Sequence, residues 1–286
     1  MILFAQHKAV RGSTKPTLVL LHGFMGDHQD WHSMRLHLSD DIPTLAIDLP
    51  GHGNSEAIEL DHKLGFKQCN NYLTNTLIKH KIKDYILCGY SLGGRVSLYH
   101  SAHIYLPQRR QDGLRLCGLI IESAHVGLEN EQQKTMRWQS DLTWAENFEQ
   151  KTLAEVLAHW YQQPIFASLT ATQKQQLINA RQHNNAAALA QTLRALSLAK
   201  QPMLIHALAQ SEFSSYYFYG EKDYIYQGIV QKIKAQYDSL TAVKFNHAGH
   251  NIHRESAEAF AHQINQLFDS VFSLSGDKKI CITKTP

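Results

Sequence analysis

A Gly-Tyr-Ser-Leu-Gly motif at residues 89–93 constrains the fold of this chain more than any other segment. It directly follows the apolar run Tyr85–Cys88, which predicts a strand, and it leads into residues 94–98, which predict a helix. The glycines on either side of Ser91 have no Cβ, so a strand and a helix can approach closely across a sharp turn. We therefore expect Ser91 to stand on a strained bend above the edge of a sheet, at the N-terminus of a helix.

Apolar runs separated by helical patterns extend along most of the chain. Strands are predicted at the N-terminal segment 1–8 and at 17–21, 44–47, 85–88, 116–121, 216–219 and 242–245. Helical spacing of apolar residues is present between them, for example at 66–78, and in a last helix from about Glu255. Continuous apolar strands that alternate with helices are typical of a parallel sheet covered on both faces. The predicted fold class is α/β, with a mostly parallel central sheet flanked by helices.

Residues 127–201 interrupt this alternation, because strand patterns disappear and helical patterns dominate. Helices are predicted at 153–161, 170–182 and 185–199, and a capping box of Thr170 and Gln173 sets the start of the second. We interpret this block as a helical cap inserted over the carboxyl edge of the sheet; the alternative is that these helices continue the core. The predicted division is a core of 1–126 and 202–272, a cap of 127–201 and a flexible tail of 273–286.

The composition narrows the class of protein. The chain has 286 residues, 43% of them hydrophobic, which is enough for a large buried core. Its formal charge of +3 comes without a basic run or a basic patch interleaved with aromatic residues, so nucleic acid is not an expected partner. No apolar run approaches the ~18 residues that span a bilayer, and the first eight residues do not resemble a signal peptide. We expect a soluble cytoplasmic protein that is a monomer or a weak homo-oligomer.

The four cysteines, at positions 69, 88, 117 and 281, do not have the paired spacing of a metal site. Cys88 and Cys117 lie within predicted strands, where buried free thiols are expected. The sequence predicts no metal and no cofactor.

Ser91 needs chemical partners, because a serine hydroxyl alone is a weak nucleophile and a weak base. A histidine can take its proton, and a carboxylate can orient that histidine. Asp223 follows the predicted strand at 216–219, and His250 follows the strand at 242–245, so the chain order is serine, acid, histidine. Open α/β sheets place their sites just beyond the carboxyl ends of strands. Ser91, Asp223 and His250 are the predicted catalytic residues.

Other residues compete for these roles, since the chain has 18 histidines. His247 and His253 are close neighbours, but only His250 follows the tight turn at Gly249, so we assign His247 to hydrogen bonding within the loop. Glu122 also ends a strand and could supply the acid, or it could be a structural carboxylate with its own partners. We favour Asp223.

A triad of this kind also needs donors for a developing oxyanion. The predicted donors are the backbone N–H groups of Phe24, in the loop after the second strand, and of Leu92, directly after the serine. His22 is interpreted as a buried loop histidine. Asp48 is expected to fix its own loop by accepting backbone hydrogen bonds.

These motifs resemble the α/β-hydrolase superfamily and, within it, the 2-succinyl-6-hydroxy-2,4-cyclohexadiene-1-carboxylate synthases of menaquinone biosynthesis. The resemblance covers roughly residues 1–270 and is carried by the segments 1–3, 22–27, 48–53, 89–95, 160–164, 248–251 and 253–255. The resemblance implies an elimination, in which a proton is removed α to a succinyl ketone and pyruvate leaves. It also implies that Ser91 is the general base and that the oxyanion hole holds the enolate-like charge. The segment 106–116 is longer than is usual in this family.

The substrate implied by the resemblance is a small molecule with three carboxylates, which requires a cationic pocket. The arginines that match the family's pocket are Arg95, one turn into the helix after Ser91, and Arg137 and Arg181 in the cap. Guanidinium groups bind carboxylates in a bidentate manner, although any one of these arginines could instead be a solvated surface charge. Tyr90, Trp160 and Tyr161 could line the pocket, or the cap aromatics could pack the cap against the core.

Two other functions remain open at this stage. A serine hydrolase acting on an ester or thioester that bears a carboxylate would use the same triad, with Ser91 as nucleophile. A binding protein that has lost catalysis is disfavoured, because the triad, the turn around Ser91 and the oxyanion loop are all complete.

Overall fold

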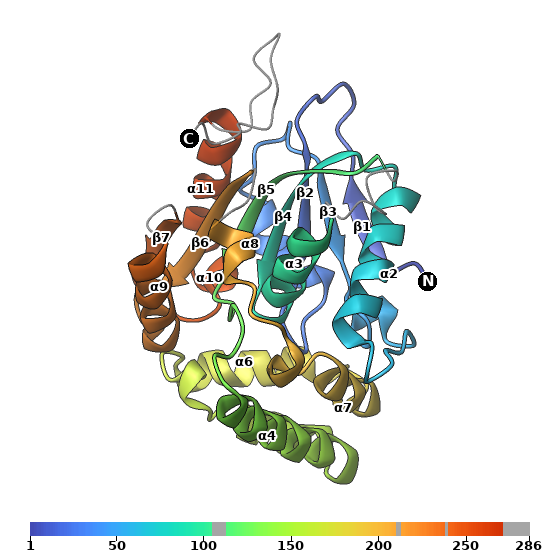
Figure 1. Ribbon diagram of the computed structural model, residues 1–286, viewed down its shortest axis with the longest axis vertical. Coiled ribbons are helices and arrows are strands. Elements are labelled where there is room, and N and C mark those ends of the chain that lie inside the picture. The colour runs from blue at the N-terminus through green and yellow to red at the C-terminus, as the bar shows by residue number, and fades with distance from the viewer. Residues whose placement is uncertain (105–112, 210–212, 238–239, 271–286) are drawn as a thin grey trace.

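The computed structural model describes residues 1–104, 113–209, 213–237 and 240–270 (Figure 1). In this part of the chain seven strands form one sheet in the order β1-β3-β2-β4-β5-β6-β7. Every neighbouring pair is parallel except β1 and β3, which are antiparallel. The strands are β1 (Ala5–Lys8), β2 (Thr17–Leu21), β3 (Thr44–Ile47), β4 (Asp84–Tyr90), β5 (Arg115–Glu122), β6 (Ser214–Gly220) and β7 (Thr241–Phe245).

All seven predicted strands are confirmed, and the fold class is α/β as expected. The N-terminal strand is shorter than the predicted segment 1–8, because its ladder with β3 pairs only Ala5–Lys8. The helices that cover the sheet are α1 (His32–Arg35), α2 (Gly65–Lys79), α3 (Leu92–His103), α8 (Ile205–Ala209), α9 (Tyr224–Gln236), α10 (Ile252–Glu255) and α11 (Ala257–Ser270).

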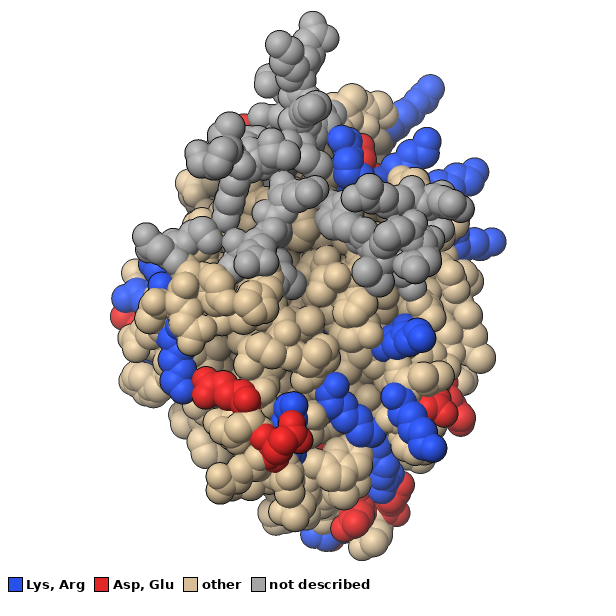
Figure 2. Space-filling model, viewed as in Figure 1, with Lys and Arg blue, Asp and Glu red and all other residues tan. Residues whose placement is uncertain are grey.

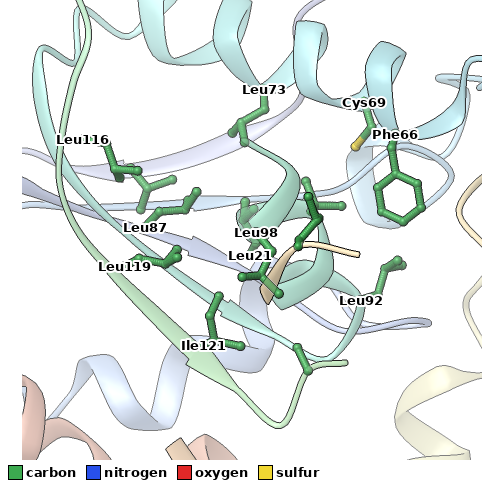
Figure 3. Packing of buried hydrophobic residues seen from close by; sticks show 14 of the residues in the cluster. Leu21, Phe66, Cys69, Leu73, Leu87, Leu92, Leu98, Leu116, Leu119 and Ile121 are labelled. Carbon is green, nitrogen blue, oxygen red and sulfur yellow. The ribbon is translucent and has the colours of Figure 1, made fainter. Parts of the chain in front are cut away.

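Side chains that alternate along the strands build a separate apolar core on each face of the sheet. On one face Leu21 and Leu87 pack with Leu73 of α2 and Leu98 of α3 (Figure 3). On the other face Leu20 packs in a cluster that contains aromatic residues of α11, among them Phe260 and Phe268. Both faces are covered, which explains why the central strands are continuous apolar runs.

Residues 127–201, which follow β5, contain four α-helices that gather beside one end of the sheet (Figure 1). They are α4 (Glu131–Gln150), α5 (Leu153–Trp160), α6 (Ala171–Arg181) and α7 (Ala186–Ala195). Their apolar residues form a third cluster, which includes Phe148, Leu157 and Leu189 and is joined by Met25 of the β2 loop. We propose on this basis that residues 127–201 are a cap with its own core.

Within this block the predicted capping box is confirmed, since the Thr170 hydroxyl accepts from the Gln173 amide and the Gln173 side chain accepts from the Thr170 amide. A second capping box, Thr152 with Glu155, starts α5. The longest helix, α4, was not predicted as a separate element. Its outward face is polar, so its apolar periodicity is weak.

The predictions for the cysteines and for the tail can be compared with the structure only in part. Cys69, Cys88 and Cys117 are buried free thiols, as expected for the last two. Cys281 and the predicted tail 273–286 lie outside the described residues, as does most of the segment 106–116.

On the face seen in Figure 2, several basic side chains project at the upper right, whereas basic and acidic side chains are interspersed over the lower part. Among the described residues no helix is both long enough and apolar enough to cross a membrane.

Candidate active site

Ser91 lies between β4 and α3 in a backbone conformation that residues other than glycine rarely adopt, with φ 49° and ψ −104°. The glycines around it allow this turn. A Cβ on Gly89 would lie 2.4 Å from the Gly93 oxygen, and one on Gly93 would lie 2.2 Å from the Leu21 oxygen. The expected strained bend is therefore present, and it holds the serine at the N-terminus of α3.

The residues predicted for catalysis meet at the carboxyl ends of β4, β6 and β7. His250 Nε2 lies 3.4 Å from Ser91 Oγ, and His250 Nδ1 lies 2.7 Å from Asp223 Oδ2. Asp223 and His250 are 4% and 3% exposed, so water does not compete for their hydrogen bond. An imidazole that donates from Nδ1 to a carboxylate presents Nε2 as the acceptor for a hydroxyl proton. The geometry thus allows Ser91 to be activated as a base or as a nucleophile.

Glu122, the alternative candidate for the acid, forms its hydrogen bonds with another histidine. Its carboxylate accepts from the His253 backbone N–H at 3.0 Å and pairs with His253 Nδ1 at 2.7 Å, and both side chains are fully buried. It therefore orients His253, which stacks on the ring of Trp31 at 4.0 Å. His247 lies in the loop before His250, where its backbone N–H donates to Glu221.

The two loop residues expected to have structural roles also have them. His22 is fully buried, and its Nε2 accepts the backbone N–H of Leu49 at 2.9 Å. Asp48 accepts backbone N–H groups of His28 and Asn54.

The predicted oxyanion donors lie on either side of Ser91. Leu92 is the first residue of α3, and a Cβ on Gly23 would lie 3.6 Å from the Ser91 Cβ, so the loop that carries Phe24 runs close to the serine. Within the described ranges neither amide has a backbone or side-chain acceptor. Two free N–H groups beside the serine are suited to stabilising negative charge on a substrate oxygen.

Ser91 opens into a cavity of about 340 Å³ between the carboxyl edge of the sheet and the helices of residues 127–201, which we call the main cavity. Besides Ser91 and Leu92, its lining includes Tyr90, Phe24 and Trp160. Trp160 packs against Phe24 at 5.2 Å and against Trp144 at 4.8 Å between ring centroids, so it both lines the main cavity and joins the cap to the core. The cavity is large enough for a small-molecule ligand.

Two of the three predicted arginines line the main cavity. Arg95 donates to the Leu196 carbonyl at 2.7 Å, and Arg137 pairs with Asp141 at 2.9 Å. Burial, with the nearby charge of Arg137, lowers the pKa of Arg95 to about 10, which still leaves it cationic at neutral pH. Two guanidinium groups face one carboxylate, so the lining carries a net positive charge that suits an anionic ligand.

Arg181 lies elsewhere, in a smaller neighbouring cavity with Tyr161. Its guanidinium donates to Asp30 at 2.6 Å, and Arg254 donates to the other oxygen of the same carboxylate at 2.7 Å. The Arg181 and Asp30 side chains are only 6% and 4% exposed. Arg181 therefore does not line the main cavity itself, although the two cavities share part of their lining, including Tyr90, Trp160 and His250. The Arg181–Asp30 pair links α6 of the cap to the core.

This buried pair leads to a stability prediction. Burial alone would raise the pKa of Asp30, but Arg181 and Arg254 reverse that effect and hold it well below its usual range. We expect Asp30→Asn to lower the free energy of unfolding by about 3–5 kcal/mol at pH 7, because it leaves buried guanidinium charge unpaired. A carboxyl with a lowered folded-state pKa stabilises fully above its unfolded pKa of about 4 and loses this effect as pH falls further.

Urea unfolding of the two proteins from pH 7 to pH 3 measures both effects. The difference between wild type and Asp30→Asn should shrink below about pH 4. The matched control is Asp40→Asn, whose carboxylate is fully exposed beside Lys8, and it should leave the midpoint unchanged. A difference that stays constant with pH would contradict the assigned pairing.

Comparisons with known proteins agree with this geometry. Residues 18–263 match the α/β-hydrolase family. A 2-succinyl-6-hydroxy-2,4-cyclohexadiene-1-carboxylate synthase of Salmonella typhimurium is 42% identical over 93% of this chain and 99% of its own length. The chain belongs to this synthase family. The synthase of Escherichia coli is 39% identical over the same shares, and the solved structure of MenH from S. aureus superimposes with a TM-score of 0.82 at 26% identity, covering 93% of this chain and 97% of that one.

Three titratable residues of the main cavity were not predicted as site residues from the sequence of this synthase-family chain: His125, Asp141 and Tyr226. For two of them the sequence contained a pattern that could have identified them. His125 follows the carboxyl end of β5 by three residues, which is the rule that located Asp223, and Asp141 lies one helical turn after Arg137. Tyr226 had none, since it is one of several aromatic residues after Asp223.

Proposed function

We propose that this protein eliminates pyruvate from 2-succinyl-5-enolpyruvyl-6-hydroxy-3-cyclohexene-1-carboxylate, giving 2-succinyl-6-hydroxy-2,4-cyclohexadiene-1-carboxylate in menaquinone biosynthesis. The observation that carries the proposal is the Ser91–His250–Asp223 arrangement, which opens into a cavity lined by Arg95 and Arg137. The printed names of relatives at about 40% identity over nearly the whole chain support the same reaction.

The proposed reaction begins with proton removal. Ser91 Oγ, as its own proton passes to His250 Nε2, takes the ring proton α to the succinyl ketone. Asp223 stabilises the imidazolium that results. Negative charge moves onto the ketone oxygen, where the Phe24 and Leu92 amides can stabilise it. This step requires the same separation of charge between Ser91 and His250 as an acyl transfer does.

The elimination then follows without an added reactant. The electrons of the broken C–H bond form a new ring double bond, the existing double bond shifts, and the carbon–oxygen bond to the enolpyruvyl group breaks. Enolpyruvate leaves as an anion and takes up, at its methylene carbon, the proton that His250 received, so that pyruvate forms and the imidazole becomes neutral again. The serine hydroxyl has already been restored by the proton from the ring carbon. No oxidant or reductant enters the balance.

The positive lining of the main cavity explains how a tricarboxylate would be held. We expect Arg95→Ala to lower kcat/KM for pyruvate release at least tenfold, since a charge-assisted hydrogen bond to a carboxylate contributes roughly 1.5–3 kcal/mol. Steady-state kinetics on the purified variant measure this. The control is Arg115→Ala, whose guanidinium pairs with Asp84 at the opposite end of the sheet and should leave kcat/KM as it is. Equal values for wild type and Arg95→Ala would exclude a binding role for Arg95.

The function itself is tested by coupling released pyruvate to an enzyme that reduces pyruvate with a nicotinamide reporter. The wild type should release pyruvate far faster than the spontaneous elimination, with one equivalent of diene formed for each pyruvate. A rate equal to the uncatalysed one would refute the proposal.

We also propose that the protein acts in the cytoplasm on this small molecule, as a monomer or a weak homo-oligomer, without a membrane or a nucleic acid as partner. Cell fractionation and light scattering of the purified protein test these points.

A further inference from the structure

His125 is a residue of the main cavity with no role in the steps above. It lies in the loop after β5 and shares the main cavity with Ser91, Arg95 and Arg137. It also borders an adjoining groove, lined among others by Met203 and His206. His125 thus stands where the groove meets the main cavity.

The hydrogen bonds of its ring fix which nitrogen carries the proton. His125 Nδ1 lies 3.1 Å from the backbone N–H of Gly127. A backbone N–H can only donate, so Nδ1 is the unprotonated acceptor, and a neutral ring carries its hydrogen on Nε2. Burial, with the nearby charges of Arg95 and Arg137, lowers the pKa of His125 to about 4, so the ring is neutral at pH 7.

The Nε2–H donor is free to meet a ligand. Across the described ranges it has no acceptor, and it does not belong to the buried polar atoms that lack a partner. An N–H group that is neither paired nor enclosed, on a residue that lines a cavity, is accessible to whatever occupies that cavity.

The loop around His125 is held in place by its own contacts. The Gln201 side chain donates to the His125 carbonyl at 2.8 Å, and the Leu204 N–H donates to the Val126 carbonyl at 2.6 Å. Gly127, at φ 127°, packs so closely on the returning chain that a Cβ would lie 2.6 Å from the Met203 Cα. The ring is therefore positioned before any ligand binds, which lowers the entropic cost of using it.

The described residues that line the main cavity carry fewer guanidinium groups than the proposed substrate has carboxylates, so a further hydrogen-bond donor is needed. The proposed substrate has three carboxylates, but among the described residues that line the main cavity only Arg95 and Arg137 carry guanidinium groups, since Arg181 lines the neighbouring cavity. A neutral donor can bind a carboxylate without adding a third positive charge beside two arginines.

We propose that His125 is a substrate-binding residue whose Nε2–H donates a hydrogen bond to one carboxylate of the substrate, next to Arg95 and Arg137. This inference rests on the proposed function and assigns one further group to its site. It predicts an effect on substrate affinity, whereas the chemical step should be nearly unaffected.

Three variants separate the donor from the rest of the side chain. His125→Leu removes both ring nitrogens, and His125→Asn places its amide near the position of Nδ1. His125→Gln can place an N–H near the position of Nε2. We expect KM for pyruvate release to rise at least tenfold in the leucine and asparagine variants and less than threefold in the glutamine variant, with kcat within threefold of wild type in all of them. His206→Leu, in the adjoining groove, is the matched control and should leave KM unchanged.

Thermal melts accompany each variant, so that loss of folding is recognised. If the leucine variant does not fold, the contrast between asparagine and glutamine decides the matter by itself. An unchanged KM in the asparagine variant, or an equal rise in the asparagine and glutamine variants, would overturn the inference while wild-type activity upheld the proposed function. If the wild type released no pyruvate, both would be overturned.

Discussion

Replacing Ser91 by alanine is expected to lower kcat for pyruvate release about 10³-fold, with KM changed less than threefold. The hydroxyl is the group that links His250 to the substrate in the proposed reaction, and general base catalysis is typically worth 10²–10⁴-fold. The arginines of the main cavity remain in place, so binding should persist. The steady-state rate of pyruvate release, measured over a range of substrate concentrations, gives both kcat and KM.

Ser101→Ala is the matched control for this variant. Ser101 lies on the same helix, α3, is 7% exposed and donates to the Leu98 carbonyl at 2.9 Å, away from the main cavity. Its kcat should equal that of wild type. If Ser91→Ala kept more than a tenth of the wild-type rate, Ser91 would not be the base.

A burst of leaving group from an activated ester together with a trapped acyl-Ser91, in a wild type without elimination activity, would favour a serine hydrolase instead.

Asp223→Asn is expected to lower kcat about 10³–10⁴-fold, again with little change in KM. An asparagine can present its N–H to His250 Nδ1, which favours the tautomer with hydrogen on Nε2. That tautomer cannot accept the Ser91 proton, and loss of the correct tautomer in triads of this kind costs up to about 10⁴ in rate. The measurement is kcat for pyruvate release at saturating substrate.

Two features make this substitution interpretable. Asp223 also accepts the Tyr226 N–H at the start of α9, and asparagine is an equally good helix N-cap, so the fold should be kept. Asp84→Asn, at the amino end of β4, changes the same chemical group far from the serine and should leave kcat unaltered. A rise in KM at constant kcat for Asp223→Asn would mean that this carboxylate binds substrate and does not orient His250.

The sheet and the position of the triad followed from the sequence, because both depend on short-range patterns. Alternation of apolar runs and helical spacing defined seven strands, and parallel strands collect their carboxyl ends at one edge. Residues placed just after β4, β6 and β7, such as Ser91, Asp223 and His250, were thus expected to meet although they are far apart in the chain. The helical character of residues 127–201 was also predicted, but α4 was not delimited, since most of its surface is polar.

The partners of the charged side chains could not be predicted in this way. Arg181 matched a family position for substrate binding, yet in the structure it is paired with Asp30, which is 151 residues away in the sequence. Arg137 and Asp141 of α4 share the main cavity with Arg95 of α3 and with His125, although no pattern in the sequence places these segments together.

The sequence by itself determined which residues could do chemistry: a serine between two glycines on a turn, and an acid and a histidine at strand ends. Local backbone geometry and strand direction are encoded within a few residues, so these features can be found without coordinates. Only the tertiary structure decided which charges are neutralised and which remain available to a ligand. Ion pairing depends on distances of a few ångströms between segments far apart in the chain, and on their burial, neither of which a linear pattern contains.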